Sequence, residues 1–391
     1  MTDTELNERK ISHIKKEAQK RKRRRLIVIT AILVFVIAVV AVGGYLLYTF
    51  RSYSSFSVTS STQLAGASDN LNYEKFADGY IQSSNSGIVY FDRDGIIWDE
   101  SFSMARPIID ICEGYIAACD MKQNDIYIYD KTGLASHTSS SHDIIDIEIS
   151  QNGLIALATN DSECNYIELK DINGNDIINV KSVFSSSGYL SDITLSEDGT
   201  KLAAAFIYIS QGSLESRVLF YDFSNSSTDD MLVGGFSQYA ETVITDVEFM
   251  NGSVVCAFGD NAMTFYSFGS EPSIISEELN LEWEIQSVYI NSKNVLVVAK
   301  DPEGVNNYHA YVYNNRGTQV ADVGFDFAYS KARLAGNNIL LHSSTDCQLI
   351  SFKGRKRYSG TFGTRISYLL PISTSNYILA TSENVQFIKL K

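Results

Sequence analysis

One phrase recurs eight times along this chain: an apolar strand, a turn with Gly or Asn, and a second strand of small and aliphatic residues. Two clear copies are IIDIEISQNGLIALAT from Ile144 and ITDVEFMNGSVVCAF from Ile244. The turn residues that mark the register are Gly79, Gly114, Gly153, Gly199, Gly252, Asn294, Asn337 and Asn376. Their spacing averages about 42 residues, and repeats of this length built from strands and turns are typical of β-propeller blades.

Most units continue with a third strand, such as IYIYDKTG (126–133) or LISFKGR (349–355). The eighth unit ends the chain with VQFIKLK and therefore lacks a fourth strand of its own. Circular folds often close with a strand from the other end of the chain, and the segment around Phe56 and Val58 lies where such a strand would begin. We predict an all-β fold over residues 73–391, an eight-bladed β-propeller with a seven-bladed one as the alternative.

Before the repeats, residues 26–48 form an uninterrupted apolar run, LIVITAILVFVIAVVAVGGYLLY. As a helix this run spans roughly 34 Å, enough to cross a hydrocarbon core of about 30 Å once. A cleaved signal peptide is the alternative, because Ala41-Val42-Gly43 resembles a cleavage site, but a usual signal core has only about 7–15 apolar residues. The sequence predicts a single transmembrane helix.

Charge on either side of this run sets the expected orientation. Residues 1–25 hold ten Lys/Arg against four acids, whereas only Arg51 follows the run closely. The positive-inside rule therefore predicts a cytoplasmic tail at 1–25, a cell-membrane location and an extracellular C-terminal domain. The Ser/Thr-rich stretch 49–72 is expected to be a tether that also contributes the closing strand.

The tail holds +6 of the whole-chain charge of −14, which leaves −20 on the rest of the chain. So acidic an exterior argues against nucleic acid as a partner, because phosphate binding needs a basic surface. The five cysteines are an odd number and indicate no disulfide framework.

Local motifs for chemistry are missing from the sequence. It contains no Gly-x-Ser-x-Gly elbow, His-Glu-x-x-His pair, phosphate loop or Cys-x-x-Cys. His137 and His142 flank a serine run and are better explained as part of a polar loop. Asp171 begins a loop that resembles a calcium site but lacks the required Gly and Glu, so a turn explains it better. We predict no catalytic residue, no metal site and no cofactor.

Two sets of charged residues remain as candidate sites. Asp110, Asp146, Asp192 and Asp246 share one place near the end of the first strand in consecutive units. They would form a ring of acids in the propeller channel, suited to cation binding or acid–base work, or would simply hold turns. Lys353, Arg355, Lys356 and Arg357 form a basic segment in an acidic domain, either a solvated turn or a docking patch for an anionic lipid, wall polymer or protein.

The basic tail, the single apolar run and the strand-Asp-x-x-Gly units together resemble the uncharacterised domain-of-unknown-function family 5711 of Firmicute bacteria. They are also similar, more weakly, to quinoprotein-type and WD40-like propellers, including the periplasmic scaffold of outer-membrane assembly. The Ala-Trp-x-x-x-x-G docking pattern of quinoprotein blades is missing, so quinone chemistry is not implied. Neither resemblance carries a catalytic residue to this chain.

Two hypotheses about function follow. The first is a non-catalytic binding or scaffolding module for a protein or an envelope polymer close to the membrane. The second is an extracytoplasmic enzyme that acts on glycans or peptides with carboxylates in the propeller channel, because propeller enzymes assemble their sites from scattered residues. We expect the first.

Overall fold

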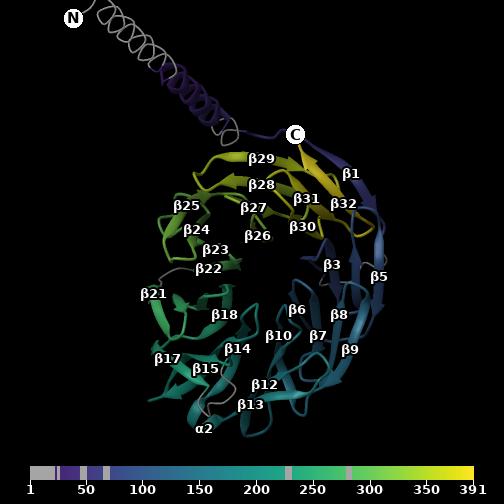
Figure 1. Ribbon diagram of the computed structural model, residues 1–391, viewed down its shortest axis with the longest axis vertical. Helices are drawn as coiled ribbons and strands as arrows, with labels where there is room; N and C mark the ends of the chain where they lie inside the picture. The colour runs from purple at the N-terminus through teal and green to yellow at the C-terminus, as the bar shows by residue number, and fades with distance from the viewer. Residues whose placement is uncertain (1–22, 24–26, 45–50, 65–70, 225–230, 279–283) are drawn as a thin grey trace, which may run out of the picture. The chain divides into compact units, whose positions relative to one another are not determined.

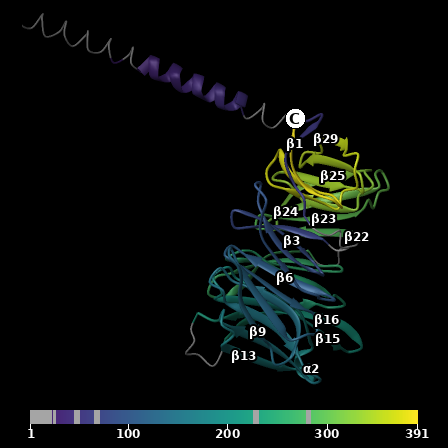
Figure 2. The same cartoon turned by 90° about the vertical axis from the view of Figure 1, so that its right-hand side faces the viewer.

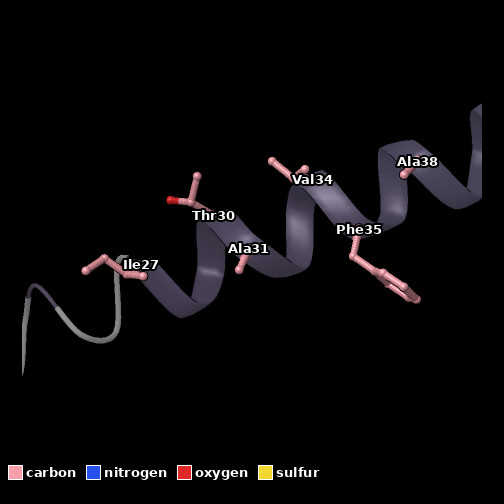
Figure 3. A pocket seen from close by; sticks show the side chains of 6 residues that line it. All are labelled: Ile27, Thr30, Ala31, Val34, Phe35 and Ala38. Carbon is pink, nitrogen blue, oxygen red and sulfur yellow. The ribbon is translucent and has the colours of Figure 1, made fainter.

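The computed structural model describes Arg23 and residues 27–44, 51–64, 71–224, 231–278 and 284–391 (Figure 1). The chain divides into two compact units, Met1–Ser52 and Tyr53–Lys391. In the first unit, Ile27–Gly44 is a helix that is long and apolar enough to cross a membrane, as a signal sequence also would be. Its side chains are almost all exposed, and Figure 3 shows six that follow one helix face, from Ile27 to Ala38.

The second unit is a propeller of eight four-stranded antiparallel sheets, which confirms the predicted fold and the larger blade number. Blade 1 contains β2 (Asn72–Phe76), β3 (Gly79–Ser84), β4 (Gly87–Phe91) and β5 (Ile96–Ser101). Blade 2 contains β6 (Pro107–Cys112), β7 (Tyr115–Asp120), β8 (Asp125–Asp130) and β9 (Gly133–Ser139). Blade 3 contains β10 (Asp143–Ile149), β11 (Ile155–Asn160), β12 (Cys164–Lys170) and β13 (Asp176–Val183), followed by the short helix α2 (Phe184–Ser187). Blade 4 contains β14 (Tyr189–Leu195), β15 (Lys201–Ser210), β16 (Ser213–Asp222) and β17 (Leu232–Tyr239).

The other four blades repeat this order. Blade 5 contains β18 (Ile244–Asn251), β19 (Val254–Gly259), β20 (Met263–Phe268) and β21 (Pro272–Glu278). Blade 6 contains β22 (Ile285–Ile290), β23 (Asn294–Lys300), β24 (Tyr308–Asn314) and β25 (Gln319–Phe325). Blade 7 contains β26 (Lys331–Leu334), β27 (Asn338–His342), β28 (Asp346–Ser351) and β29 (Lys356–Thr361). Blade 8 contains β30 (Tyr368–Pro371), β31 (Asn376–Ala380) and β32 (Val385–Leu390), with β1 (Phe56–Thr62) as its fourth strand.

The first strand of each blade lies nearest the axis and the fourth lies at the rim, as Figure 1 shows for the labelled strands. Figure 2 gives the view turned by 90°. Blade 8 takes its rim strand from the segment before blade 1. β1 pairs antiparallel with β32, from Phe56 opposite Leu390 to Thr62 opposite Val385. The last residue extends this contact, since the Lys391 backbone N–H donates to the Ser55 carbonyl over 2.8 Å. The circle is therefore closed by hydrogen bonds between residues near both ends of this unit.

The second strand of each blade is buried on both faces, because blades pack against one another on both sides. Along β15, Leu202 and Ala204 pack toward blade 3, whereas Ala203 and Ala205 pack toward blade 5. Successive strand residues point to opposite faces, so both sets must be apolar. This explains the runs of small and aliphatic residues in the sequence repeat. All five cysteines lie in the described residues and are free thiols, four of them buried.

Candidate binding site at the propeller axis

The innermost strands place equivalent residues at the same height around the axis. On β10, β14 and β18 a bulge precedes Asp146, Asp192 and Asp246, and each aspartate lies opposite a residue of the second strand: Ala158, Ala205 and Phe258. Lys331 of β26 occupies the same register, opposite His342. We call these residues, and those two positions further along each strand, the axial positions. Because side chains alternate along a strand, the two axial positions of a blade share one face.

Carboxylates at the axial positions of blades 2 to 4 bind the backbone of the next blade. Asp192 accepts a hydrogen bond from the Val247 N–H of blade 5 over 2.7 Å. The other bonds of this kind run from Ile149 N–H to Asp110 (2.6 Å), from Ile193 N–H to Asp146 (3.4 Å) and from Leu195 N–H to Glu148 (3.1 Å). An innermost strand is a sheet edge with unpaired N–H groups, which need acceptors when they are removed from water. These acids therefore hold neighbouring blades together.

Asp110, Asp146, Glu148 and Asp192 together form what we call the acidic arc. Their burial favours the protonated form of each carboxyl group. Burial, together with the nearby carboxylates, raises the pKa of Asp110 to about 7 and that of Asp192 to about 9. It also raises the pKa values of Asp146 and Glu148, and Asp146 shares a side-chain hydrogen bond with Asp192. Two carboxyl groups can share such a bond only when one of them carries a proton. The arc therefore carries less negative charge near neutral pH than its composition suggests.

Blade 5 breaks the pattern. Asp246 and Glu248 are both exposed, and within the described residues neither accepts a backbone N–H from β22 of blade 6. β14 lies directly against β18, whereas β18 and β22 do not approach each other as closely. Water reaches Glu248, while the protein around the axis still raises its pKa, to about 8. These two carboxylates keep acceptor capacity that the fold does not use.

Blade 7 carries positive charge at the axial positions where blades 3 and 5 carry acids. Lys331 and Arg333 form no ion pair with any carboxylate in the described part of the chain. The Arg333 guanidinium carbon lies 4.4 Å from the ring centre of Tyr368 and 5.4 Å from that of Tyr289, and the Lys331 Nζ lies 5.0 Å from the Tyr368 ring. Arg333 also donates a hydrogen bond to the Tyr368 hydroxyl. We call these four residues the basic–tyrosine cluster.

A buried histidine borders the cluster. His342 is 4% exposed, and its Nδ1 donates to the Ser343 carbonyl over 3.0 Å, whereas its Nε2 has no hydrogen-bond partner. Burial lowers the pKa of His342, and the charges of Lys331 and Arg333 lower it further. The ring is therefore neutral, with Nε2 as an unused acceptor beside two cations.

The structure brings the four predicted aspartates to one region, but they do not share one place: Asp110 occupies the second axial position, because it accepts the Ile149 N–H as Glu148 accepts the Leu195 N–H. Asp246 differs from the others in its bonding.

The predicted basic segment is divided: Lys353, Arg355 and Lys356 are exposed around the hairpin between β28 and β29, whereas Arg357 is buried. Its Nη1 donates to the Asn338 side-chain oxygen over 3.2 Å. Arg357 therefore does not belong to an exposed patch.

Sequence reasoning missed the second axial position. Glu148 and Glu248 follow Asp146 and Asp246 by two residues, the strand period that places both on one face. The same spacing joins Lys331 to Arg333. Aligning the units by their turns and reading both positions would have found them.

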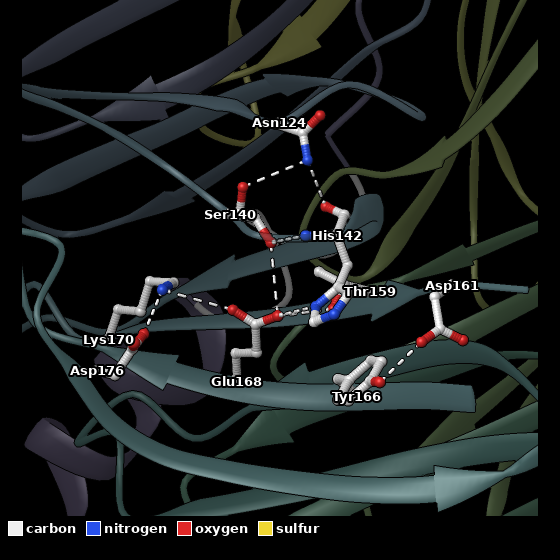
Figure 4. Close-up of polar contacts among 9 residues, drawn as sticks. All are labelled: Asn124, Ser140, His142, Thr159, Asp161, Tyr166, Glu168, Lys170 and Asp176. Atoms are coloured by element: carbon white, nitrogen blue, oxygen red, sulfur yellow. Dashed lines mark hydrogen bonds and ion pairs between the residues drawn. The ribbon is translucent and has the colours of Figure 1, made fainter. Parts of the chain in front are cut away.

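Other polar candidates have structural explanations. Figure 4 shows Glu168, 3% exposed, accepting from the Thr159 hydroxyl over 2.8 Å and lying 3.4 Å from the Lys170 Nζ. His142 contacts the same carboxylate at 3.3 Å, whereas His137 pairs separately with Asp125. The Asp171 carboxylate is bonded by the N–H groups of residues 173 and 175, as in a turn. Among the described residues no group of three or more His, Cys, Asp or Glu is arranged to hold a metal ion.

Comparison with known proteins gives a family and a fold. The family model described as "Family of unknown function (DUF5711)" matches residues 49–390. Curated protein sequences give no significant match.

Solved structures similar to this chain include the following three. BamB from Moraxella catarrhalis has a TM-score of 0.50 at 12% identity and covers 86% of this chain and 100% of its own. Sqt1 from Saccharomyces cerevisiae has a TM-score of 0.52 at 9% identity, covering 87% and 99%. Apo AztD from Citrobacter koseri has a TM-score of 0.50 at 11% identity, covering 76% and 86%. At such identities the likeness concerns the fold alone.

Proposed function

Because the chain belongs to this family of unknown function, whose description names no activity, we propose its function from the propeller itself. We propose a non-catalytic binding module that recognises a protein or a cell-envelope polymer at the outer face of the cell membrane. One observation carries this proposal: Asp110, Asp146 and Asp192 accept backbone N–H groups of the next blade. Carboxylates that accept these backbone hydrogen bonds stabilise the fold. Other axial side chains, such as Lys331 and Arg333, form no ion pair in the described residues and are available to bind a ligand.

The location rests on the helix Ile27–Gly44 and the charges around it. A helix that is apolar on all sides needs lipid or protein around it. Ten Lys/Arg precede it, and the chain after the basic tail has a net charge of −20. This asymmetry supports an anchor with its N-terminus in the cytoplasm and the propeller outside.

A second candidate function is hydrolysis of glycans or peptides at the acidic arc. The hydrogen bond between Asp146 and Asp192 favours it, because two carboxyl groups that share a proton are a known device of acid–base hydrolysis. The backbone bonds that both groups accept weigh against it, since they leave little room for a substrate oxygen or a water.

Incubation of the full-length chain with envelope fractions and peptide mixtures separates the two functions. A binding module retains material that mass spectrometry recovers unchanged. Cleavage products that vanish with Asp192→Asn would contradict the proposal and support the hydrolase. Glu113→Gln, which removes an exposed acid on a turn outside the arc, is the matched control.

A further inference from the structure

We infer that the axis beside blade 6 binds a peptide segment with an acidic and a basic side chain, the acidic one on Lys331 and Arg333 and the basic one on Asp246 and Glu248. The inference rests on the proposed binding function and names the class of partner. It combines two observations: cations that form no ion pair in the described residues, and carboxylates that accept no backbone N–H group from the next blade.

The cations supply the first half of the site. Lys331 and Arg333 lie on one face of β26, in a unit that is strongly acidic overall, and yet no carboxylate of the described residues pairs with them. Placing two like charges side by side is unfavourable, and burial together with Arg333 lowers the pKa of Lys331. An incoming carboxylate would relieve this repulsion.

The geometry of Arg333 suits a carboxylate. The rings of Tyr289 and Tyr368 lie within cation–π distance of the guanidinium, and the Tyr368 hydroxyl takes one of its hydrogen bonds. A guanidinium has five N–H donors in one plane, so further donors remain for a bidentate carboxylate. The Tyr368 hydroxyl in turn donates to the Asn72 side-chain oxygen over 2.7 Å, which holds it in place.

The carboxylates of blade 5 supply the second half. Asp246 and Glu248 occupy the axial register of Lys331 and Arg333, two blades away, and only blade 6 stands between them. At that register blade 6 offers Ser287 and Tyr289, which carry no charge. The axis therefore presents an acidic pair and a basic pair on either side of a neutral polar strand, and an incoming cation would favour the ionised form of Glu248, whose pKa the fold raises to about 8.

This arrangement favours a ligand with both charges over a polyanion. A phosphate polymer would meet Lys331 and Arg333 but would be repelled by the carboxylates of blade 5. A peptide can place Glu or Asp on one side and Lys or Arg on the other.

Calorimetric titration of the full-length chain in nonionic detergent tests the inference with four probes. These are a capped hexapeptide of alternating Glu and Lys, capped hexaglutamate, capped hexalysine and linear polyphosphate. We expect the alternating peptide to bind most tightly. Arg333→Gln should weaken its binding about tenfold or more, and Asp246→Asn with Glu248→Gln should do the same, because each leaves a charge of the peptide unpaired.

Lys356→Met is the matched control, since it removes an exposed positive charge on the rim strand β29 and should leave binding unchanged. Arg333→Lys should lose less affinity than Arg333→Gln, and thermal melts identify any variant that fails to fold. Tighter binding of polyphosphate, equal losses with Lys356→Met, or no binding of the alternating peptide up to about 1 mM would overturn the inference. These results overturn the inference about the peptide without contradicting the proposed non-catalytic function, which is contradicted only by cleavage of a bound substrate.

Discussion

Asp110 predicts a particular dependence of stability on pH. Burial raises its pKa in the folded chain from 3.8 to about 7. An acid with a raised folded-state pKa stabilises the fold below its unfolded-state pKa, and that stability is lost as the pH rises through the folded-state value. The change from 3.8 to about 7 corresponds to at most about 4 kcal/mol, of which about 2.7 kcal/mol would be lost between pH 5 and 8.

Water near the axis screens part of this effect, so we expect a loss of about 1–3 kcal/mol over that interval. Asp110→Asn keeps an oxygen for the Ile149 N–H but cannot ionise. The stability advantage of the variant over the wild type should be about 1–3 kcal/mol larger at pH 8 than at pH 5. Urea unfolding of the full-length chain in nonionic detergent, followed by circular dichroism at several pH values, measures the difference.

Glu113→Gln is the control for this experiment, since Glu113 is an exposed acid on the turn that follows the same strand. Its free energy of unfolding should follow the wild-type pH dependence. The reasoning is refuted if the free energy of unfolding of Asp110→Asn follows the wild-type pH dependence.

Three further predictions concern the fold and its orientation. Glu168→Gln should lower the free energy of unfolding by about 3 kcal/mol, because it leaves the buried Lys170 without its buried carboxylate partner. Lys300→Met, which breaks an exposed ion pair, should change the free energy of unfolding by less than about 1 kcal/mol. Equal losses in the two variants would contradict the role given to the buried pair. Deleting Phe56–Thr62 should lower the melting temperature by at least about 5 °C, since it removes the rim strand of blade 8, and an unchanged melting temperature would show that the strand does not close the circle. Alkaline phosphatase fused after Lys391 should be active and a fluorescent protein there dark; the reverse would place the propeller in the cytoplasm.

The sequence was sufficient for the architecture because each blade repeats the same physical signals. The Gly or Asn turn between the first two strands and the doubly buried second strand, such as Ala203–Ala205, give a pattern that can be counted. The shortage of one strand in the last unit pointed to the segment around Phe56, where β1 lies in the structure.

The axis was less predictable, because its chemistry depends on which blades adjoin. Asp192 and Asp246 look alike in the sequence, yet the neighbouring strand offers an N–H to Asp192 and none in the described residues to Asp246. Lys331 and Arg333 belong to a unit without the aspartate that marks blades 2 to 5, so the aspartate pattern did not indicate them. Burial of Arg357 does not follow from strand alternation, because the pairing of β29 has a register shift there and both Arg357 and Tyr358 are buried.

The central claim, that this propeller binds its partner at the axis, is tested most directly by photocrosslinking in living cells. A photoreactive residue replaces Gln286, which is exposed on β22 between the charged blades, and in a second strain replaces Ala135, which is exposed on the rim strand β9. The account predicts a discrete protein adduct from position 286, on a peptide with both acidic and basic side chains, and none of that adduct from position 135. Adducts from position 135 alone, or the same adducts from both positions, would contradict it.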